Sequence, residues 1–250
     1  MKRGRKTLLP ALSLLLCAGL ASADEIRVAV ASNFTDAIKD IAQSFEKKTG
    51  HQVTLAFSST GKHYAQIKHG APFEAFFAAD VKRPKLLEKE GIAQPGSRFT
   101  YAIGKIVLWS PDADLVDPKG KVLNDGGFRY LSIANPKLAP YGKAAQQVLK
   151  AKGLWKAMQG RMVRGENIGQ TFQFVKSGNA ELGFVALSQI KKPAAASEGS
   201  YWLPPQSLYD PIAQQAVLLK DNAVARKFIN FVKSDEQALK IIQAYGYGVD

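Results

Sequence analysis

Cysteine and histidine are scarce in this 250-residue chain, which holds one cysteine and three histidines. Cys17 lies in the N-terminal apolar segment, and the histidines (His51, His63 and His69) do not have the His-x-x-x-His spacing of a helical metal site. The Gly-x-Ser-x-Gly nucleophile motif and the Lys-Ser/Thr pair of a phosphate-binding P-loop are also missing. We therefore expect no metal ligands, no cofactor and no catalytic residues.

Long apolar runs are confined to the N-terminus. Four basic residues among the first six precede the apolar stretch Leu8–Leu20, and the small residues Ala21-Ser22-Ala23 follow it. This order is typical of a secretory signal cleaved after Ala23. The stretch is shorter than the roughly 20 residues that a membrane-spanning helix needs. We expect residues 1–23 to be a signal peptide and Asp24 to begin the exported protein.

Acidic residues are outnumbered by basic ones, 21 to 34. Removing residues 1–23, which hold four basic residues and no acidic one, lowers the formal net charge from +13 to +9. The basic residues are spread along the chain, and no basic helix interleaved with aromatic residues is present, which argues against nucleic acid. The excess charge indicates either a solvated basic surface or a positive field that attracts anions.

The mature chain alternates short apolar strands with amphipathic helices, beginning with a strand at Ile26–Ala31 and a helix that closes at Thr49-Gly50. This alternation predicts an α/β fold with a mainly parallel sheet. Tyr101–Trp109 is a long apolar stretch broken by Gly104-Lys105, and residues 191–207 are expected to be irregular. Other strands are expected at Val53–Phe57, Phe73–Ala79, Leu131–Ala134, Arg161–Arg164, Gly183–Leu187 and Pro211–Leu219.

Four segments share one pattern, in which a strand ends, a polar or glycine-bearing turn follows and a helix begins. They are Ser32-Asn33, Ser59-Thr60-Gly61, Pro140-Tyr141-Gly142 and Asn167-Ile168-Gly169. Ligands of open α/β sheets bind beyond the carboxyl ends of the strands, where the free N–H groups of helix starts favour negative charge. Such turns could encircle a small anion with neutral donors. Each turn taken alone is far more often a simple helix cap than a ligand site.

Several longer segments resemble the periplasmic molybdate-binding proteins of an ABC importer. They are Val30–Ala37, Phe57–Gly61, Gly70–Asp80, Leu182–Leu187 and Asn135–Ala145. The resemblance covers essentially the whole mature chain, in register. It implies a two-lobed type II periplasmic binding protein fold with the ligand, molybdate or tungstate, in a cleft between the lobes.

The resemblance also implies which residues bind the oxyanion. Asn33, with Ser32 beside it, takes the first-turn position, and Thr60, with Ser59 beside it, takes the second. Tyr141 takes the third, and Ile168 takes the fourth with its backbone N–H as the donor. Many members carry a tyrosine where this chain has Ala186, so we expect the Tyr141 hydroxyl to replace that donor.

The family further implies that lobe I spans residues 24–102 and 209–250 and that lobe II spans residues 103–208. Hinges near Tyr101–Gly104 and Tyr209–Ile212 would close the cleft on binding. We expect a monomer in the periplasm that delivers its ligand to a membrane permease.

Two alternatives stay open. The ligand could be another tetrahedral oxyanion such as sulfate, because sulfate and molybdate differ only slightly in size. Protonatable phosphate is disfavoured, since none of the four turns holds an acceptor carboxylate. A periplasmic enzyme on the same fold would need a nucleophile or an acid–base pair, and Asp80 and Glu166 are isolated carboxylates in the sequence.

Overall fold

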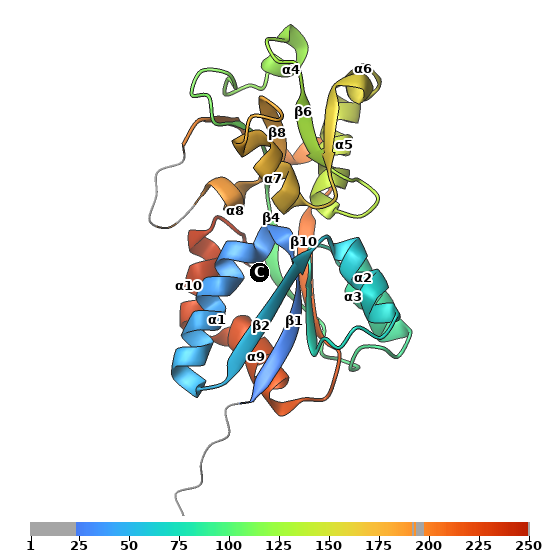
Figure 1. The fold of residues 1–250 in the computed structure, drawn as a ribbon, viewed down its shortest axis with the longest axis vertical. Helices are drawn as coiled ribbons and strands as arrows, with labels where there is room; N and C mark the ends of the chain where they lie inside the picture. The colour runs from blue at the N-terminus through green and yellow to red at the C-terminus, as the bar shows by residue number, and fades with distance from the viewer. Residues whose placement is uncertain (1–23, 192, 194–197, 250) are drawn as a thin grey trace, which may run out of the picture.

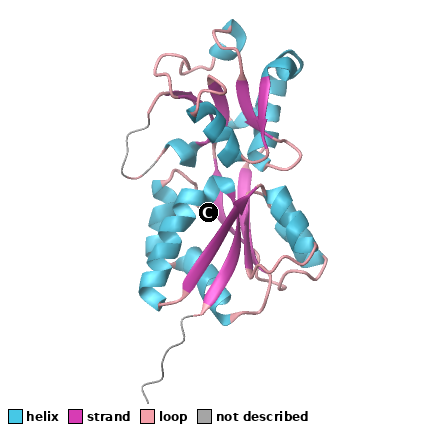
Figure 2. Ribbon diagram, in the orientation of Figure 1, coloured by secondary structure: helices cyan, strands magenta, loops and turns pink. Residues whose placement is uncertain are grey.

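The computed structural model describes residues 24–191, 193 and 198–249. The expected signal peptide, with Cys17, lies outside this range. Two five-stranded sheets form two lobes, one above the other in Figure 1, and helices cover both faces of each sheet (Figure 2). The type II fold expected from the resemblance is therefore confirmed. No helix within the described ranges is long and apolar enough to cross a membrane.

Lobe I contains a sheet with the strand order β2-β1-β3-β10-β4. Its strands are β1 (Glu25–Ala31), β2 (Gln52–Ser58), β3 (Ala75–Ala78), β4 (Phe99–Gly104) and β10 (Ile212–Leu218). Its helices are the 3-10 turn η1 (Ser32–Phe34), α1 (Thr35–Thr49), α2 (Thr60–Lys68), α3 (Lys82–Lys89), α9 (Ala223–Ser234) and α10 (Glu236–Ala244).

Lobe II contains a sheet with the strand order β7-β6-β8-β5-β9. Its strands are β5 (Ile106–Ser110), β6 (Leu131–Ala134), β7 (Met162–Gly165), β8 (Leu182–Ala186) and β9 (Ser200–Trp202). Its helices are α4 (Val122–Asp125), α5 (Pro140–Ala151), α6 (Trp155–Met158), η2 (Gln159–Arg161), α7 (Ile168–Lys176), α8 (Leu187–Ile190) and η3 (Gln206–Leu208).

Both sheets are mixed, whereas the sequence predicted a mainly parallel arrangement. β1 pairs in parallel with β2 and β3, and β6 with β7 and β8. However, β10 runs antiparallel to β3 and β4, and β5 runs antiparallel to β8 and β9. The antiparallel strands are those next to the connections between the lobes. Parallel pairing of consecutive strands needs a long crossover connection, usually a helix. Where the chain passes from one lobe to the other, no such crossover precedes the strand that enters the new sheet.

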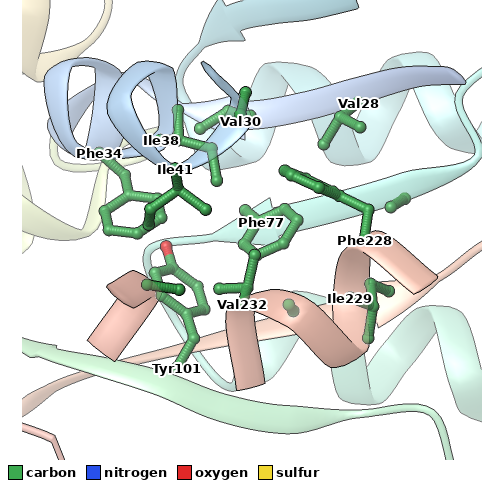
Figure 3. Close-up of a cluster of buried hydrophobic side chains, with 14 of the residues drawn as sticks. Val28, Val30, Phe34, Ile38, Ile41, Phe77, Tyr101, Phe228, Ile229 and Val232 are labelled. Carbon is green, nitrogen blue, oxygen red and sulfur yellow. The ribbon is translucent and has the colours of Figure 1, made fainter. Parts of the chain in front are cut away.

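Lobe I packs its largest core between the sheet and the helices α1, α9 and α10 (Figure 3). The buried residues of α1 are Ala37, Ile38, Ile41, Ala42 and Phe45, the helical spacing that the sequence showed. The helix ends at Gly50, whose φ of 76° is left-handed. This core fixes β1 and α1, and so it places the turn that joins them at the edge of the lobe that faces lobe II.

The apolar stretch around Gly104 divides between the lobes. β4 completes the sheet of lobe I, and β5, which starts two residues later, enters the sheet of lobe II. A Cβ atom on Gly104 would overlap the Tyr141 hydroxyl, so only glycine allows α5 to approach this crossing so closely. β9 is a strand inside the region expected to be irregular, of which residues 192 and 194–197 lie outside the described residues.

Candidate functional site

The four turns identified in the sequence meet at one small cavity between the lobes, with a volume of about 10 Å³. All six candidate binding residues line it, and each is at most 8 % exposed. They are Ser32, Asn33, Ser59, Thr60, Tyr141 and Ile168. The other lining residues are Ala31, Ser58, Ala79, Ala139 and Pro140. Since these described residues include no charged side chain, the cavity is bounded by neutral groups and helix starts alone.

The second turn combines helix capping with free donors. Ser59 is the N-cap of α2, and its Oγ accepts from Lys62 N at 3.3 Å. Thr60 Oγ1 accepts from Ala79 N at 3.0 Å. Both hydroxyls are acceptors in these contacts, so each keeps its own proton for a further bond. Capping and ligand binding, which the sequence left as alternatives, are thus compatible here.

The first turn makes contacts with lobe II. Ser32 Oγ accepts from Gly169 N at 3.2 Å, and the Asn33 carbonyl accepts from Ser188 Oγ at 3.0 Å. Asn33 Nδ2 donates to Gln214 Oε1 at 2.7 Å and to the Tyr247 hydroxyl at 3.0 Å. The side-chain NH2 of Asn33 is therefore already engaged within the protein.

The third and fourth turns come from lobe II. Pro140 occupies the first turn of α5, and Tyr141 follows it, 1 % exposed. Burial raises the pKa of Tyr141 well above its ordinary value, so its hydroxyl stays protonated. Asn167 caps α7 by accepting from Gln170 N at 3.0 Å. As the first residue of α7, Ile168 has a backbone N–H with no partner inside the helix.

Ala186 is fully buried at the end of β8 and is not among the residues that line the cavity. Other polar groups occupy the space between the lobes near it. The Tyr247 hydroxyl donates to the Asn33 carbonyl at 2.7 Å and lies 2.9 Å from Ser188 Oγ. Burial raises the pKa of Tyr247, so it is also a neutral hydroxyl.

Sequence reasoning missed a layer of polar residues behind the cavity. Gln214, on β10, contacts Asn33, Tyr101 and Tyr141, and Tyr247 contacts Asn33. Gln214 had a detectable signal, because it and Gln215 are polar residues inside an otherwise apolar strand. Tyr247 had none, since it lies in a short segment after the last helix.

Direct contacts across the cleft hold the lobes together around the cavity. Gly61 N donates to the Leu138 carbonyl at 2.9 Å, and Arg83 Nη2 donates to the Lys137 carbonyl at 3.1 Å. Lys62 Nζ lies 3.4 Å from Glu166 Oε2, and both side chains are more than half exposed. With the bond between Gly169 and Ser32, these contacts describe a closed cleft.

The described residues hold no group of three or more His, Cys, Asp or Glu side chains able to bind an ion. Asp80 accepts from Arg83 N at 2.9 Å and pairs with its guanidinium. Asp80 therefore caps α3, and Glu166 makes the exposed ion pair with Lys62.

Comparison with known proteins finds relatives that match this chain over nearly its whole length. The chain is 54 % identical over 239 residues to the molybdate-binding protein ModA of Azotobacter vinelandii, with 94 % of each chain covered. It is 48 % identical over 243 residues to ModA of Rhodobacter capsulatus, covering 95 % of this chain and 94 % of the relative. These relatives are named as binding proteins, not as enzymes.

Among solved structures, the periplasmic molybdate-binding protein of Azotobacter vinelandii matches with a TM-score of 0.87 and 46 % identity, over 90 % of this chain and 99 % of that one. The sulfate-binding protein SubI of Mycobacterium tuberculosis has a TM-score of 0.70 at 13 % identity, covering 90 % of this chain and 86 % of that one, which shows the shared fold alone. Residues 26–248 match the model of the bacterial extracellular solute-binding proteins, and the chain belongs to this family.

Proposed function

We propose that this protein captures molybdate or tungstate in the cavity between its lobes and delivers it to an ABC importer. The main support for this proposal is that four turns from two lobes meet at one cavity. The described residues that line this cavity include no charged side chain. Helix N-termini and neutral hydroxyls stabilise a fully ionised oxyanion without needing an acceptor. The similarity to molybdate-binding proteins over nearly the whole chain supports the choice of ligand.

The proposed binding set is Ser32, Asn33, Ser59, Thr60, Tyr141 and Ile168. Ser59, Thr60 and Tyr141 supply hydroxyl protons, and Asn33 and Ile168 supply backbone N–H groups. The anion replaces its water shell with these donors, and it is held as an intact oxyanion with no protein ligand on the metal. No cofactor takes part in this function.

We propose lobe boundaries at residues 24–102 with 209–250 for lobe I and 103–208 for lobe II. The chain crosses between the lobes close to these boundaries, after β4 ends at Gly104 and before β10 starts at Ile212, so those two connections form the hinge. Donors from both lobes must surround the anion together. Its binding therefore favours the closed arrangement through contacts that an open cleft would not provide.

We further propose that residues 1–23 direct export and that the mature protein acts as a periplasmic monomer. The basic start, the apolar stretch and the Ala-Ser-Ala end of this segment support a signal peptide. The partner in delivery is the membrane permease of the importer.

Calorimetric titration of the mature protein with molybdate, tungstate and sulfate tests the function. We expect saturable 1:1 binding of molybdate and tungstate, together with a rise in Tm, because a ligand that binds only the folded state stabilises it. Sulfate at equal concentration should not displace molybdate. Displacement would favour the sulfate alternative, and absence of binding by all three anions would refute an oxyanion receptor.

A further inference from the structure

Gly61 lies where the two lobes approach each other beside the cavity. It follows Thr60 at the start of α2 in lobe I, and its N–H donates to the Leu138 carbonyl of lobe II at 2.9 Å. Leu138 comes just before α5 and is followed by Ala139. Since Thr60 and Ala139 both line the cavity, the contact between Gly61 and Leu138 lies at the border of the cavity.

Helix formation does not explain a glycine at this position. Gly61 is buried in the first turn of α2, and it is not among the glycines that have a positive φ. Its backbone conformation is therefore open to other residues, and alanine would favour the helix. Because a glycine here lowers the stability of the helix, the reason for it lies outside α2.

The approach of lobe II supplies that reason. A Cβ atom on Gly61 would lie 3.0 Å from the Leu138 carbonyl oxygen, 3.1 Å from Leu138 Cα and 3.0 Å from Arg83 Nη2. The Arg83 guanidinium is the end of a flexible side chain and can move away. The Leu138 atoms belong to the backbone, so they can retreat only if the chain around them moves.

The backbone on each side of this contact is held within its own lobe. In lobe II, Leu138 N and Ala139 N both donate to the Asn135 carbonyl, at 3.1 and 2.9 Å. In lobe I, Ala79 N donates to Thr60 Oγ1 at 3.0 Å. Rotation of one lobe against the other breaks none of these bonds, because the hinge connections absorb it. A side chain at position 61 would therefore hold the lobes further apart instead of shifting either turn.

We propose that Gly61 is a positioning residue that lets the cleft close fully on the anion. It does not line the cavity itself, and its missing side chain allows Leu138 to come close enough for donors of both lobes to reach one anion. This inference rests on the proposed function and adds to it the residue that sets how far the lobes close. Because the contact joins the two lobes, it is made only when the cleft is closed. A side chain at this position should therefore speed the release of the anion and leave its entry into the open cleft unchanged.

Gly61→Ala tests the proposal by stopped-flow fluorescence with molybdate, which gives the association and dissociation rate constants. We expect the dissociation rate constant and Kd to rise roughly 10-fold, the effect of modest overpacking, while the association rate constant stays unchanged. The Tm without ligand should also stay unchanged, because the variant relieves the contact by opening the cleft. Gly61→Ser repeats the test if Gly61→Ala does not fold.

Gly160→Ala is the matched control. It carries the same substitution at an exposed position of lobe II, where an added Cβ meets no atom within 4 Å. It should change neither rate constant.

An unchanged dissociation rate constant in Gly61→Ala would overturn the proposal, because the lobes would then close as tightly with the added methyl group. A lower Tm without ligand would also overturn it, since the methyl group would then strain a single lobe and not the closed cleft. In either case the wild type still binds molybdate and the proposed function stands. Failure of the wild type to bind molybdate refutes the function and the positioning role together.

Discussion

Tyr141 has the one polar side chain that lobe II supplies among the described residues lining the cavity. We expect Tyr141→Phe to weaken molybdate binding, because a lost hydrogen bond to a charged ligand costs about 1.5–3 kcal/mol. This corresponds to a roughly 10- to 100-fold rise in Kd, measured by calorimetry. Tyr130→Phe, at an exposed tyrosine of the same lobe, should have no effect. An unchanged Kd in Tyr141→Phe would mean that this side chain only packs.

Gly104 affects binding through its lack of a side chain. A Cβ atom at this position would overlap the Tyr141 hydroxyl and crowd Gln214 Nε2. We expect Gly104→Ala to displace Tyr141, to lower the unfolding free energy by about 1–3 kcal/mol, as overpacking does, and to raise the molybdate Kd. Thermal unfolding and calorimetry measure the two effects.

Gly160→Ala is the control for Gly104→Ala, because an added Cβ at Gly160 meets no atom within 4 Å. It should change neither Tm nor Kd by a measurable amount. If Gly104→Ala behaved like this control, the close packing of Tyr141 against β4 would be disproved.

At the scale of elements, the first turn of α7 must be formed for the backbone N–H of Ile168 to point into the cavity. Asn167 Oδ1 caps this helix by accepting from Gln170 N. We expect Asn167→Ala to cost about 1 kcal/mol of stability, the usual effect of a lost N-cap, and to weaken molybdate binding as well. Chemical denaturation and calorimetry measure the two quantities.

Asn222→Ala separates these two effects. Asn222 caps α9, which packs in the core of lobe I, and accepts from Val224 N and Ala225 N. Its replacement should cost similar stability without changing Kd. Equal changes of Kd in both variants would show that affinity follows global stability rather than the geometry of the α7 turn.

His63 joins α2 to β1 directly behind the second turn. It is 2 % exposed, and its Nε2 lies 3.2 Å from the Val30 carbonyl. Burial lowers its pKa below the ordinary value of 6.5. A folded-state pKa below the unfolded one means that protonation favours unfolding. The stability that His63 provides is therefore present above pH 6.5 and is lost as the pH falls from there through the folded-state pKa.

We expect Tm to fall between pH 6.5 and pH 5, and the slope to flatten in His63→Gln. Carboxylates with lowered pKa, such as Glu88 and Asp235, act in the same direction but only below about pH 4.5, their ordinary range. Differential scanning calorimetry across pH 7.5–5 measures the slope. The same slope in the variant would assign the acid sensitivity to another group.

The elements that the sequence predicted well are those whose burial follows a regular period. α1 has the apolar spacing expected for it, and the four polar turns all reach the cavity. The direction of β10 and β5 within their sheets could not be predicted, because it depends on how the chain returns between lobes. The polar residues of β10 could be noticed in the sequence, but the three partners of Gln214 could not be predicted, since they are distant in sequence.

At the scale of the whole molecule, the positive charge should speed the arrival of the anion. The net charge of +9 after removal of residues 1–23 provides a long-range field that salt screens over a Debye length of about 8–10 Å at physiological ionic strength. We expect the association rate constant for molybdate to fall as NaCl is raised from 20 to 500 mM, with a much smaller change in the dissociation rate constant. Stopped-flow measurement of intrinsic tyrosine and tryptophan fluorescence follows both rates. An association rate constant that does not depend on salt would indicate that the basic residues form only a solvated surface and do not attract the anion.

The place of β10 also has a consequence for synthesis and export. β10 lies between β3 and β4, yet all of lobe II precedes it in the chain (Figure 1). A nascent chain that has not yet reached Ile212 therefore lacks an inner strand of lobe I and the glutamine that donates to the Tyr141 hydroxyl. Lobe I can finish folding only after nearly the whole polypeptide has been made. The protein becomes competent to hold its ligand late, once the chain is long enough to bring its last strand back to the first lobe.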